Sequence, residues 1–362
     1  RGMGEASYFL ASWGEISEAI GLVDACRISM DANPTWAGIR MQIVETARWF
    51  HAQRILFLID PDHVCARTDI EWARSILSLI SLSGGLYMLS DVTSVYEGER
   101  SDIIRRTLPP LQTITGETGA LDTSYPAFTW TKLHGFAVHK NEKPIAAEEV
   151  SAEDAYNMAG NYPTMNDNHP FGSLWAIHLN QYGRKWCVLG RFATVALKES
   201  RIDMEALGLS KSEEYLCFDF WKQQYLGKAL GELFCPALKL GNCQVISLTK
   251  GKETPQIIAS SRHVSMDAVS VDSQTWKDTA LSLRINGVIG TAETYWFHKP
   301  AKYRLVGKEA AGALCNIRCD NEILKVDITF FETSCNIKMK FEETAAVLHD
   351  LCPESIRKAG FW

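Results

Sequence analysis

The stretch Gly21-Leu-Val-Asp-Ala-Cys-Arg-Ile-Ser-Met-Asp31, followed by Ala32-Asn-Pro-Thr-Trp36, decides how the fold is interpreted. It begins as an apolar run, typical of a buried strand, and ends in the charged residues Arg27 and Asp31. A helix start follows, and Pro34 suits its first turn. An α/β barrel presents its chemistry in this way, where a buried strand ends just before a helix. We therefore predict that Asp31 is catalytic. The alternative is that Asp31 only caps the helix or pairs with Arg27.

Strands and helices alternate along the first 110 residues. The helix predicted at 33–50 carries apolar residues at three- and four-residue steps, and Thr68-Asp-Ile-Glu71 has the form of a capping box. This rhythm is typical of a parallel sheet. No Gly-x-Gly-x-x-Gly follows these strands, so a dinucleotide-binding sheet has no support. Strands are predicted at 7–12, 20–28, 54–59 and 85–89, and helices at 33–50, 68–82 and from about 97 to Pro109-Pro110.

Polar residues follow each predicted strand, namely Ser12-Trp13, Asp31, Asp60 with Asp62, and Asp91. In a closed barrel such residues meet at one rim. Only about four strands are predicted, whereas closure takes eight. We therefore predict the C-terminal half of a (β/α)8 TIM barrel, with the other half upstream of residue 1.

Four motifs carry a family resemblance. Arg27-Ile-Ser-Met-Asp31, with Trp36 five positions on, resembles the sixth-strand motif of the alpha-galactosidase (melibiase) clan of glycoside hydrolases. Asp60-Pro-Asp62 resembles the segment after the seventh strand of that clan. Residues 79–91 and 99–110 resemble its eighth-strand segment and its last barrel helix. The resemblance covers residues 8–110 and continues more loosely to about residue 346.

The resemblance implies that Asp31 is the general acid/base and that Arg27 binds substrate. A retaining glycosidase needs a second carboxylate about 5–5.5 Å away as nucleophile. In this clan that aspartate ends the fourth strand, so we predict that it lies upstream of this chain. Because direct contact with Arg27 would oppose protonation of Asp31, we expect Arg27 to contact sugar hydroxyls or the nucleophile instead.

Further residues are weaker candidates for substrate binding. Asp60 and Asp62 either bond substrate, orient Arg27, or form a structural turn. Trp36 is either a sugar platform or part of the core. Trp13 lies where the fifth-strand loop of the clan shapes the sugar pocket, and His63 adjoins Asp62. Ile59 stands where the clan often has asparagine.

Beyond residue 112 the pattern changes to short strands. A Thr-, Gly- and Ser-rich linker is predicted at 113–125, antiparallel β-sandwich units at 126–262 and 263–346, and a tail at 347–362. The predicted fold class is thus a half-barrel followed by antiparallel β-sandwich domains. Strands are predicted at 175–180, 185–192, 215–221, 244–248, 280–285, 293–297, 302–306 and 324–331.

Composition sets further limits. The net charge of −6 argues against nucleic acid as a partner, because phosphate binding needs a basic surface. No apolar run spans a bilayer, since the best candidate, 75–89, is interrupted by serines and Gly84-Gly85. Four of the ten cysteines lie in apolar runs, where free thiols act as small hydrophobes, and we predict no metal and no cofactor. The proline in Asn33-Pro-Thr35 excludes a glycan, so the sequence leans slightly towards a reducing compartment. The four cysteines are Cys26, Cys187, Cys217 and Cys243.

We predict a retaining α-glycoside hydrolase that acts on terminal α-galactosides or related α-glycosides, with a glycoside or oligosaccharide as its partner. One alternative is an α-glycosidase or transglycosylase of other specificity. Another is a non-catalytic carbohydrate-binding protein or degenerate fragment, in which the β domains bind sugar. Exposed aromatic rows would favour binding, but the patterns around Trp186, Trp221 and Trp296 predict core positions. The sequence does not fix the oligomeric state. Secretion also stays open, because a chain that begins in mid-domain shows no signal peptide in any case.

Overall fold

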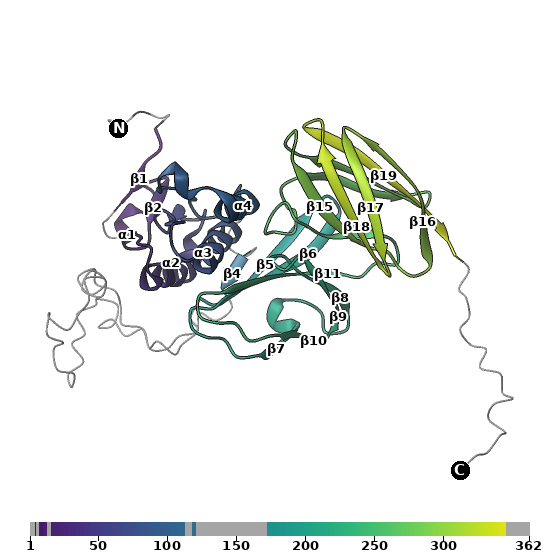
Figure 1. The fold of residues 1–362 in the computed structure, drawn as a ribbon. Helices are drawn as coiled ribbons and strands as arrows, with labels where there is room; N and C mark the ends of the chain where they lie inside the picture. The colour runs from purple at the N-terminus through teal and green to yellow at the C-terminus, as the bar shows by residue number, and fades with distance from the viewer. Residues whose placement is uncertain (1–3, 5–6, 13–15, 113–117, 121–171, 345–362) are drawn as a thin grey trace, which may run out of the picture. The chain divides into compact units, whose positions relative to one another are not determined.

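A computed structural model describes residues 4, 7–12, 16–112, 118–120 and 172–344 (Figure 1). The chain divides into two compact units. The first contains the residues up to 251 together with 258–270, and the second contains 252–257 and the residues from 271 onwards. Among the residues described, no helix is both long and apolar enough to cross a membrane.

The first unit begins with a parallel sheet in the order β1-β2-β3. Helices follow each strand, so the predicted strand–helix alternation is confirmed, although every strand is shorter than predicted. The predicted half-barrel stays a prediction, because three parallel strands are described here and barrel closure takes eight. The bounds are β1 (Leu10–Ala11), α1 (Ile16–Ala19), β2 (Ala25–Arg27), α2 (Trp36–Trp49), η1 (Phe50–Ala52), β3 (Leu58–Asp60), α3 (Ile70–Ser83), η2 (Thr93–Val95) and α4 (Gly98–Thr107).

Helix α2 buries the predicted apolar stripe, including Ile39, Ile43 and Ala47. Its N-cap is Thr35, whose hydroxyl accepts from the Gly38 N–H at 3.2 Å. The helix therefore starts three residues later than predicted, and the placement of Pro34 in its first turn was wrong. The reason is that Thr35 has extended backbone angles and a side-chain oxygen that satisfies a first-turn amide.

Helix α3 is capped by Asp69, whose carboxylate accepts from the Glu71 N–H at 2.9 Å. The predicted capping box starting at Thr68 was wrong. The Thr68 hydroxyl instead donates to the Pro34 carbonyl at 2.6 Å and ties this loop to the segment before α2. A carboxylate one residue closer to the helix satisfies the free amides, which leaves the threonine available for the tertiary contact.

The strand predicted at 85–89 does not form a regular strand. The segment is extended and runs beside β3, with the Leu86 N–H donating to the Ile59 carbonyl at 2.9 Å and the Val64 N–H donating to Met88 at 2.8 Å. Only Leu89 bridges in parallel, to Val64. A side chain at Gly85 would lie 3.3 Å from the Ile59 carbonyl oxygen, so glycine permits the close approach of the two backbones.

The β-rich part of the first unit is a sheet in the order β4-β5-β6-β11-β8-β9, with a separate β7–β10 pair. The predicted strands at 175–180, 185–192, 215–221 and 244–248 are confirmed within it. Strand β4 falls within the segment that was predicted to be a linker, and its backbone pairs with β5. The neighbouring linker residues lie outside the described residues. The bounds are β4 (Thr118–Ala120), β5 (Leu174–Gln181), β6 (Arg184–Phe192), β7 (Ser200–Asp203), η4 (Glu205–Leu207), β8 (Glu214–Asp219), β9 (Gln224–Leu230), β10 (Glu232–Cys235) and β11 (Cys243–Lys250).

Helix α3 bonds to segments outside the strands of the β-rich part through three buried serines, spaced three residues apart. The Ser78 hydroxyl accepts from the Trp221 indole N–H at 3.1 Å, and the Ser81 hydroxyl lies 3.2 Å from His263 Nε2. The Ser75 hydroxyl donates to the carbonyl of Gly241. These hydrogen bonds satisfy polar groups that would otherwise be buried at a cost.

Two antiparallel sheets follow, in the orders β12-β15-β18-β17 and β13-β14-β19-β16. Buried residues alternate with partly or fully exposed ones along β14, β18 and β19, so each sheet has one apolar face, as a β-sandwich requires. Trp186 and Trp296 are buried, as predicted, whereas Trp221 is only partly buried. The bounds are β12 (Gln256–Ser260), β13 (Val271–Lys277), β14 (Ala280–Asn286), β15 (Ala292–His298), β16 (Tyr303–Ala311), β17 (Ala313–Asp320), β18 (Ile323–Phe330) and β19 (Ser334–Glu343).

Candidate active site

The candidate site lies at the carboxyl ends of β2 and β3. β2 ends at Arg27 and β3 at Asp60, and these residues are register partners in the parallel pair. The chain leaving β2 carries Asp31, and the chain leaving β3 carries Asp62. The fold therefore brings together side chains that are 35 positions apart in the sequence. Ligands of open α/β sheets bind at such strand ends.

Arg27 is the centre of this cluster. Its Nη2 donates to Asp62 Oδ2 at 2.8 Å and to Asp31 Oδ1, and its Nη1 donates to Ser12 Oγ at 3.1 Å. The Arg27 side chain is 9% exposed and that of Asp62 11%, whereas that of Asp31 is 55% exposed. The site thus presents one accessible carboxylate, Asp31, above a buried ion pair.

The contact between Arg27 and Asp31 differs from the sequence prediction, which placed Arg27 on sugar hydroxyls or the nucleophile. A guanidinium that is nine-tenths buried needs carboxylate partners, because an unpaired charge in such a place is costly. Asp31 and Asp62 supply them from the ends of two neighbouring strands. The alternative that the sequence left open, a pairing of Asp31 with Arg27, is the arrangement observed.

Asp62 contacts both Arg27 and the loop that carries Asp31. Its backbone is left-handed, with φ 74°, and its N–H donates to Asp60 Oδ1 at 2.8 Å. Its Oδ2 accepts from the Ala32 N–H at 2.6 Å as well as from Arg27. Aspartate tolerates this left-handed conformation better than most residues, and the Asp60 carboxylate fixes the turn by accepting from the Asp62 N–H. Asp62 therefore holds the arginine and the loop that carries Asp31.

Asp60 lies beneath the turn and is 1% exposed. Burial raises the pKa of its carboxyl group to about 6, against the opposing effect of the hydrogen bond from the Asp62 N–H. Because it is buried and accepts from the Asp62 N–H, Asp60 is better placed to stabilise the Asp62 turn than to contact a substrate. His63 Nδ1 lies 3.2 Å from Asp62 Oδ1, so this histidine, about one-third exposed, is a member of the cluster.

Sequence reasoning missed Gln42, which holds the second loop in place. Its buried Nε2 donates to the carbonyls of Pro61 and His63, at 2.9 and 3.0 Å. The signal was present in the sequence, because Gln42 is a polar residue next to the apolar stripe of a helix. A buried amide in that position needs backbone partners.

The remaining predicted residues lie elsewhere or outside the description. The half-buried Trp36 ring packs against Trp72, with centroids 5.4 Å apart, and lies close to Gly241. Trp13 lies outside the described residues. Asp91, which the sequence predicts at the same rim, pairs with Arg67 and accepts from its backbone N–H at 3.0 Å.

An exposed carboxylate beside a buried arginine can bind hydroxyl groups and move a proton. This geometry, at the carboxyl ends of parallel strands, defines the class of an α/β protein with an acidic strand-end site, here followed by antiparallel β sheets. No model of a known protein family matches the sequence, and no curated protein matches it.

The solved structures to which the chain is similar are glycoside hydrolases. A GH27 β-L-arabinopyranosidase from Geobacillus stearothermophilus shares 10% identity at a TM-score of 0.43, over 68% of this chain and 51% of its own. Alpha-galactosidase I from Mortierella vinacea shares 11% at 0.37, over 64% and 54%. The alpha-galactosidase of Saccharomyces cerevisiae shares 8% at 0.38, over 64% and 60%. The chain thus spans about half the length of the arabinopyranosidase.

Proposed function

We propose that this chain is part of a retaining α-glycosidase that acts on terminal α-galactosides or related α-glycosides, with Asp31 as general acid/base. The observation that supports this is the convergence of Arg27, Asp31 and Asp62 at the carboxyl ends of two parallel strands. The motif Arg27-x-x-x-Asp31 adds the family resemblance. The nucleophilic aspartate is proposed to precede residue 1.

Asp31 would serve twice in the reaction. It would first protonate the leaving oxygen and later remove a proton from the attacking water. The ion pair with Arg27 suits the second of these steps, because a base must be ionised. For the first step Arg27 must leave Asp31, and Asp62 Oδ2 is a second acceptor already within 2.8 Å of the same nitrogen. Asp62 would then neutralise Arg27 while Asp31 carries its proton.

The second candidate is a non-catalytic carbohydrate-binding protein. The direct contact between Arg27 and Asp31 favours it, since a permanent ion pair would leave the site able to bind hydroxyl groups but unable to donate a proton. The two candidates differ in one measurable respect, which is whether Asp31 takes part in turnover.

The test is the replacement Asp31→Asn in the complete protein that contains this chain. General acid–base help is worth roughly 10²–10⁴-fold, so natural α-galactosides should lose activity by that factor or more. Activated aryl α-galactosides should lose far less in the first step, because they need no proton. Azide needs no base either, so added azide should restore turnover and give the α-glycosyl azide.

Asp24→Asn is the matched control, since Asp24 lies before the amino end of the same strand and accepts from the Phe9 N–H. It should leave the dependence on the leaving group unchanged. A uniform loss across leaving groups in Asp31→Asn, without azide rescue, would contradict the acid/base role. The 362-residue chain alone should be inactive. Turnover by it that Asp31→Ala abolishes would mean that the nucleophile is Asp60, Asp62 or Asp91.

A further inference from the structure

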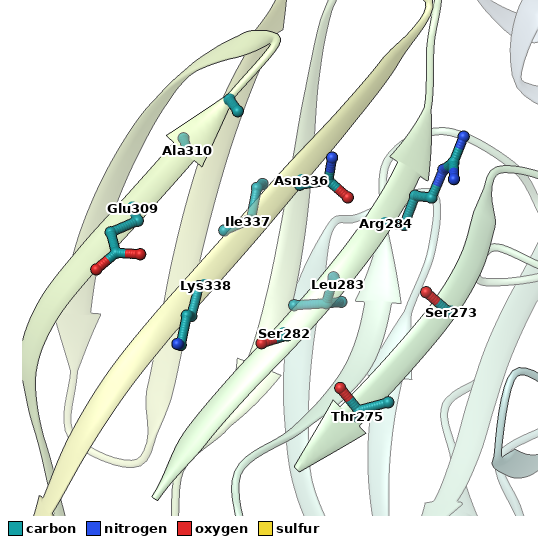
Figure 2. Close-up of a pocket in the computed structure, with 11 residues that line it drawn as sticks. Ser273, Thr275, Ser282, Leu283, Arg284, Glu309, Ala310, Asn336, Ile337 and Lys338 are labelled. Atoms are coloured by element: carbon teal, nitrogen blue, oxygen red, sulfur yellow. The ribbon is translucent and has the colours of Figure 1, made fainter. Parts of the chain in front are cut away.

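The second unit carries a polar groove on the solvent face of the sheet β13-β14-β19-β16, with a volume of about 430 Å³. Figure 2 shows side chains from all four strands around it. The buried neighbours Leu283 and Ile337 belong to the strands of its floor. This volume falls within the range of small-ligand sites. We call this feature the polar groove.

Strand register arranges the polar side chains in two rows. The first row crosses the four strands through consecutive register pairs and consists of Thr275, Ser282, Lys338 and Glu309. Neighbours within such a row have Cβ atoms about 4.5–5.5 Å apart. Over its three intervals the row of hydroxyl, ammonium and carboxylate groups therefore extends about 14–16 Å, which is the scale of a short oligosaccharide.

The second row lies two residues further along each strand and consists of Ser273, Arg284, Asn336 and Ala311. The small alanine leaves the β16 side of this row open. Hydroxyl and amide groups both donate and accept hydrogen bonds, as sugar hydroxyls do. The two rows thus combine groups for polyhydroxylated ligands with two strong donors for an anion.

The charges of the groove do not cancel. Among the lining residues, Arg284 and Lys338 are basic and Glu309 is acidic. Glu309 pairs with Lys340, and Asp272, outside the lining, lies 3.6 Å from Arg284 Nε, so Arg284 is partly paired already. Among the described residues, Lys338 and the neighbouring Lys277 have no ion-pair partner. The polar groove is therefore locally positive on a chain whose net charge is −6. Anions are attracted to this place rather than to the protein as a whole.

We propose that the polar groove binds an anionic oligosaccharide, a sugar chain that carries carboxylates. One carboxylate lies on Lys338 and Arg284, and ring hydroxyls lie on Ser282, Thr275 and Asn336. Charge complementarity selects the anion, and the hydroxyl-rich rows select a sugar over an acidic peptide, which offers few hydroxyl groups. This site is separate from the proposed glycosidase site, and its test involves no turnover.

The experiment is calorimetric titration of the 362-residue chain with trigalacturonate, with neutral galactotriose and hexaglutamate as comparison ligands. Trigalacturonate should bind one to one, and more weakly as salt rises. Lys338→Gln removes a charge-assisted hydrogen bond and should weaken binding about tenfold or more. Thr275→Glu places a carboxylate in the groove and should abolish binding.

Lys239→Gln is the matched control, because it removes the same charge from an exposed loop of the first unit. It should change the dissociation constant less than about twofold. Lys338 and Thr275 are exposed, and unchanged melting curves verify that the variants fold. The proposal is overturned if trigalacturonate does not bind at millimolar concentration, if galactotriose or hexaglutamate binds equally well, or if Lys338→Gln binds like the native chain.

Discussion

His263 offers the sharpest test of how the first unit is held together. Its imidazole is fully buried, with Nε2 3.2 Å from the Ser81 hydroxyl and Nδ1 2.7 Å from the Ser265 hydroxyl. Nδ1 also accepts from the Ser265 N–H at 3.2 Å. Burial, together with the nearby Arg262, lowers the pKa of His263 to about 4. The folded protein therefore holds this histidine neutral.

The pKa difference fixes the sign and size of the effect. An unfolded histidine titrates near 6.5, so between pH 6.5 and 4 the unfolded chain binds a proton that the folded chain does not. Stability is then fully present above pH 6.5 and falls as the pH drops towards 4. At 1.36 kcal/mol per pH unit, the difference between 6.5 and about 4 corresponds to a loss of about 3 kcal/mol.

The assay is urea unfolding of the native chain and His263→Gln from pH 7.5 to 4. The variant lacks the ionisable group, so its stability deficit should shrink by about 3 kcal/mol over this range. Ser81→Ala is the control, because it removes one hydrogen bond, worth about 1 kcal/mol, but keeps the buried imidazole. A constant deficit, or a His263 imidazole that titrates near 6.5 by NMR, would refute the reasoning.

Two further predictions concern the loops. Gly241→Ala should destabilise the protein by about 2–4 kcal/mol, because its Cβ would clash with the Trp72 ring at a φ of +81°. Gly183→Ala has a similar φ but open space around it, so it should cost only about 1–2 kcal/mol in the same urea titration. Equal losses would contradict the clash. Asp62→Asn should cost about 1–3 kcal/mol by weakening the hold on the buried Arg27 and should speed exchange of the Ala32 amide hydrogen, so unchanged exchange would show that Asp62 does not hold that loop.

Periodicity predicted most of the secondary structure. Helices α2 and α3 and the strands of the β-rich part follow from apolar residues at helical or alternating spacing. The strands that were missed, such as β9 and β10, bury little or only alternate side chains. β10 pairs with the non-adjacent strand β7, whereas β9 pairs with β8 directly before it. In both, the apolar pattern is weak, so backbone pairing rather than burial defines the strand.

The serines of α3 also show that local sequence pattern does not reveal long-range partners. In the sequence, Ser75, Ser78 and Ser81 only interrupt an apolar run. In the structure they are the residues through which the helix bonds to the β-rich part of the same unit. A hydroxyl group is satisfied equally well by water and by a distant backbone or side-chain group. The residue type alone therefore could not distinguish a solvent-exposed serine from one that bonds to another part of the protein.

The sequence by itself determined that polar residues end the parallel strands, because strand and helix periodicity place Arg27, Asp31 and Asp62 just beyond apolar runs. Only the tertiary structure decided how these three pair. Register between β2 and β3 brings the loop of Asp62 beside Arg27, and burial of the guanidinium then draws in both carboxylates. Pairing depends on distances across strands and on solvent exclusion, and neither quantity is encoded in the spacing of residues along one chain.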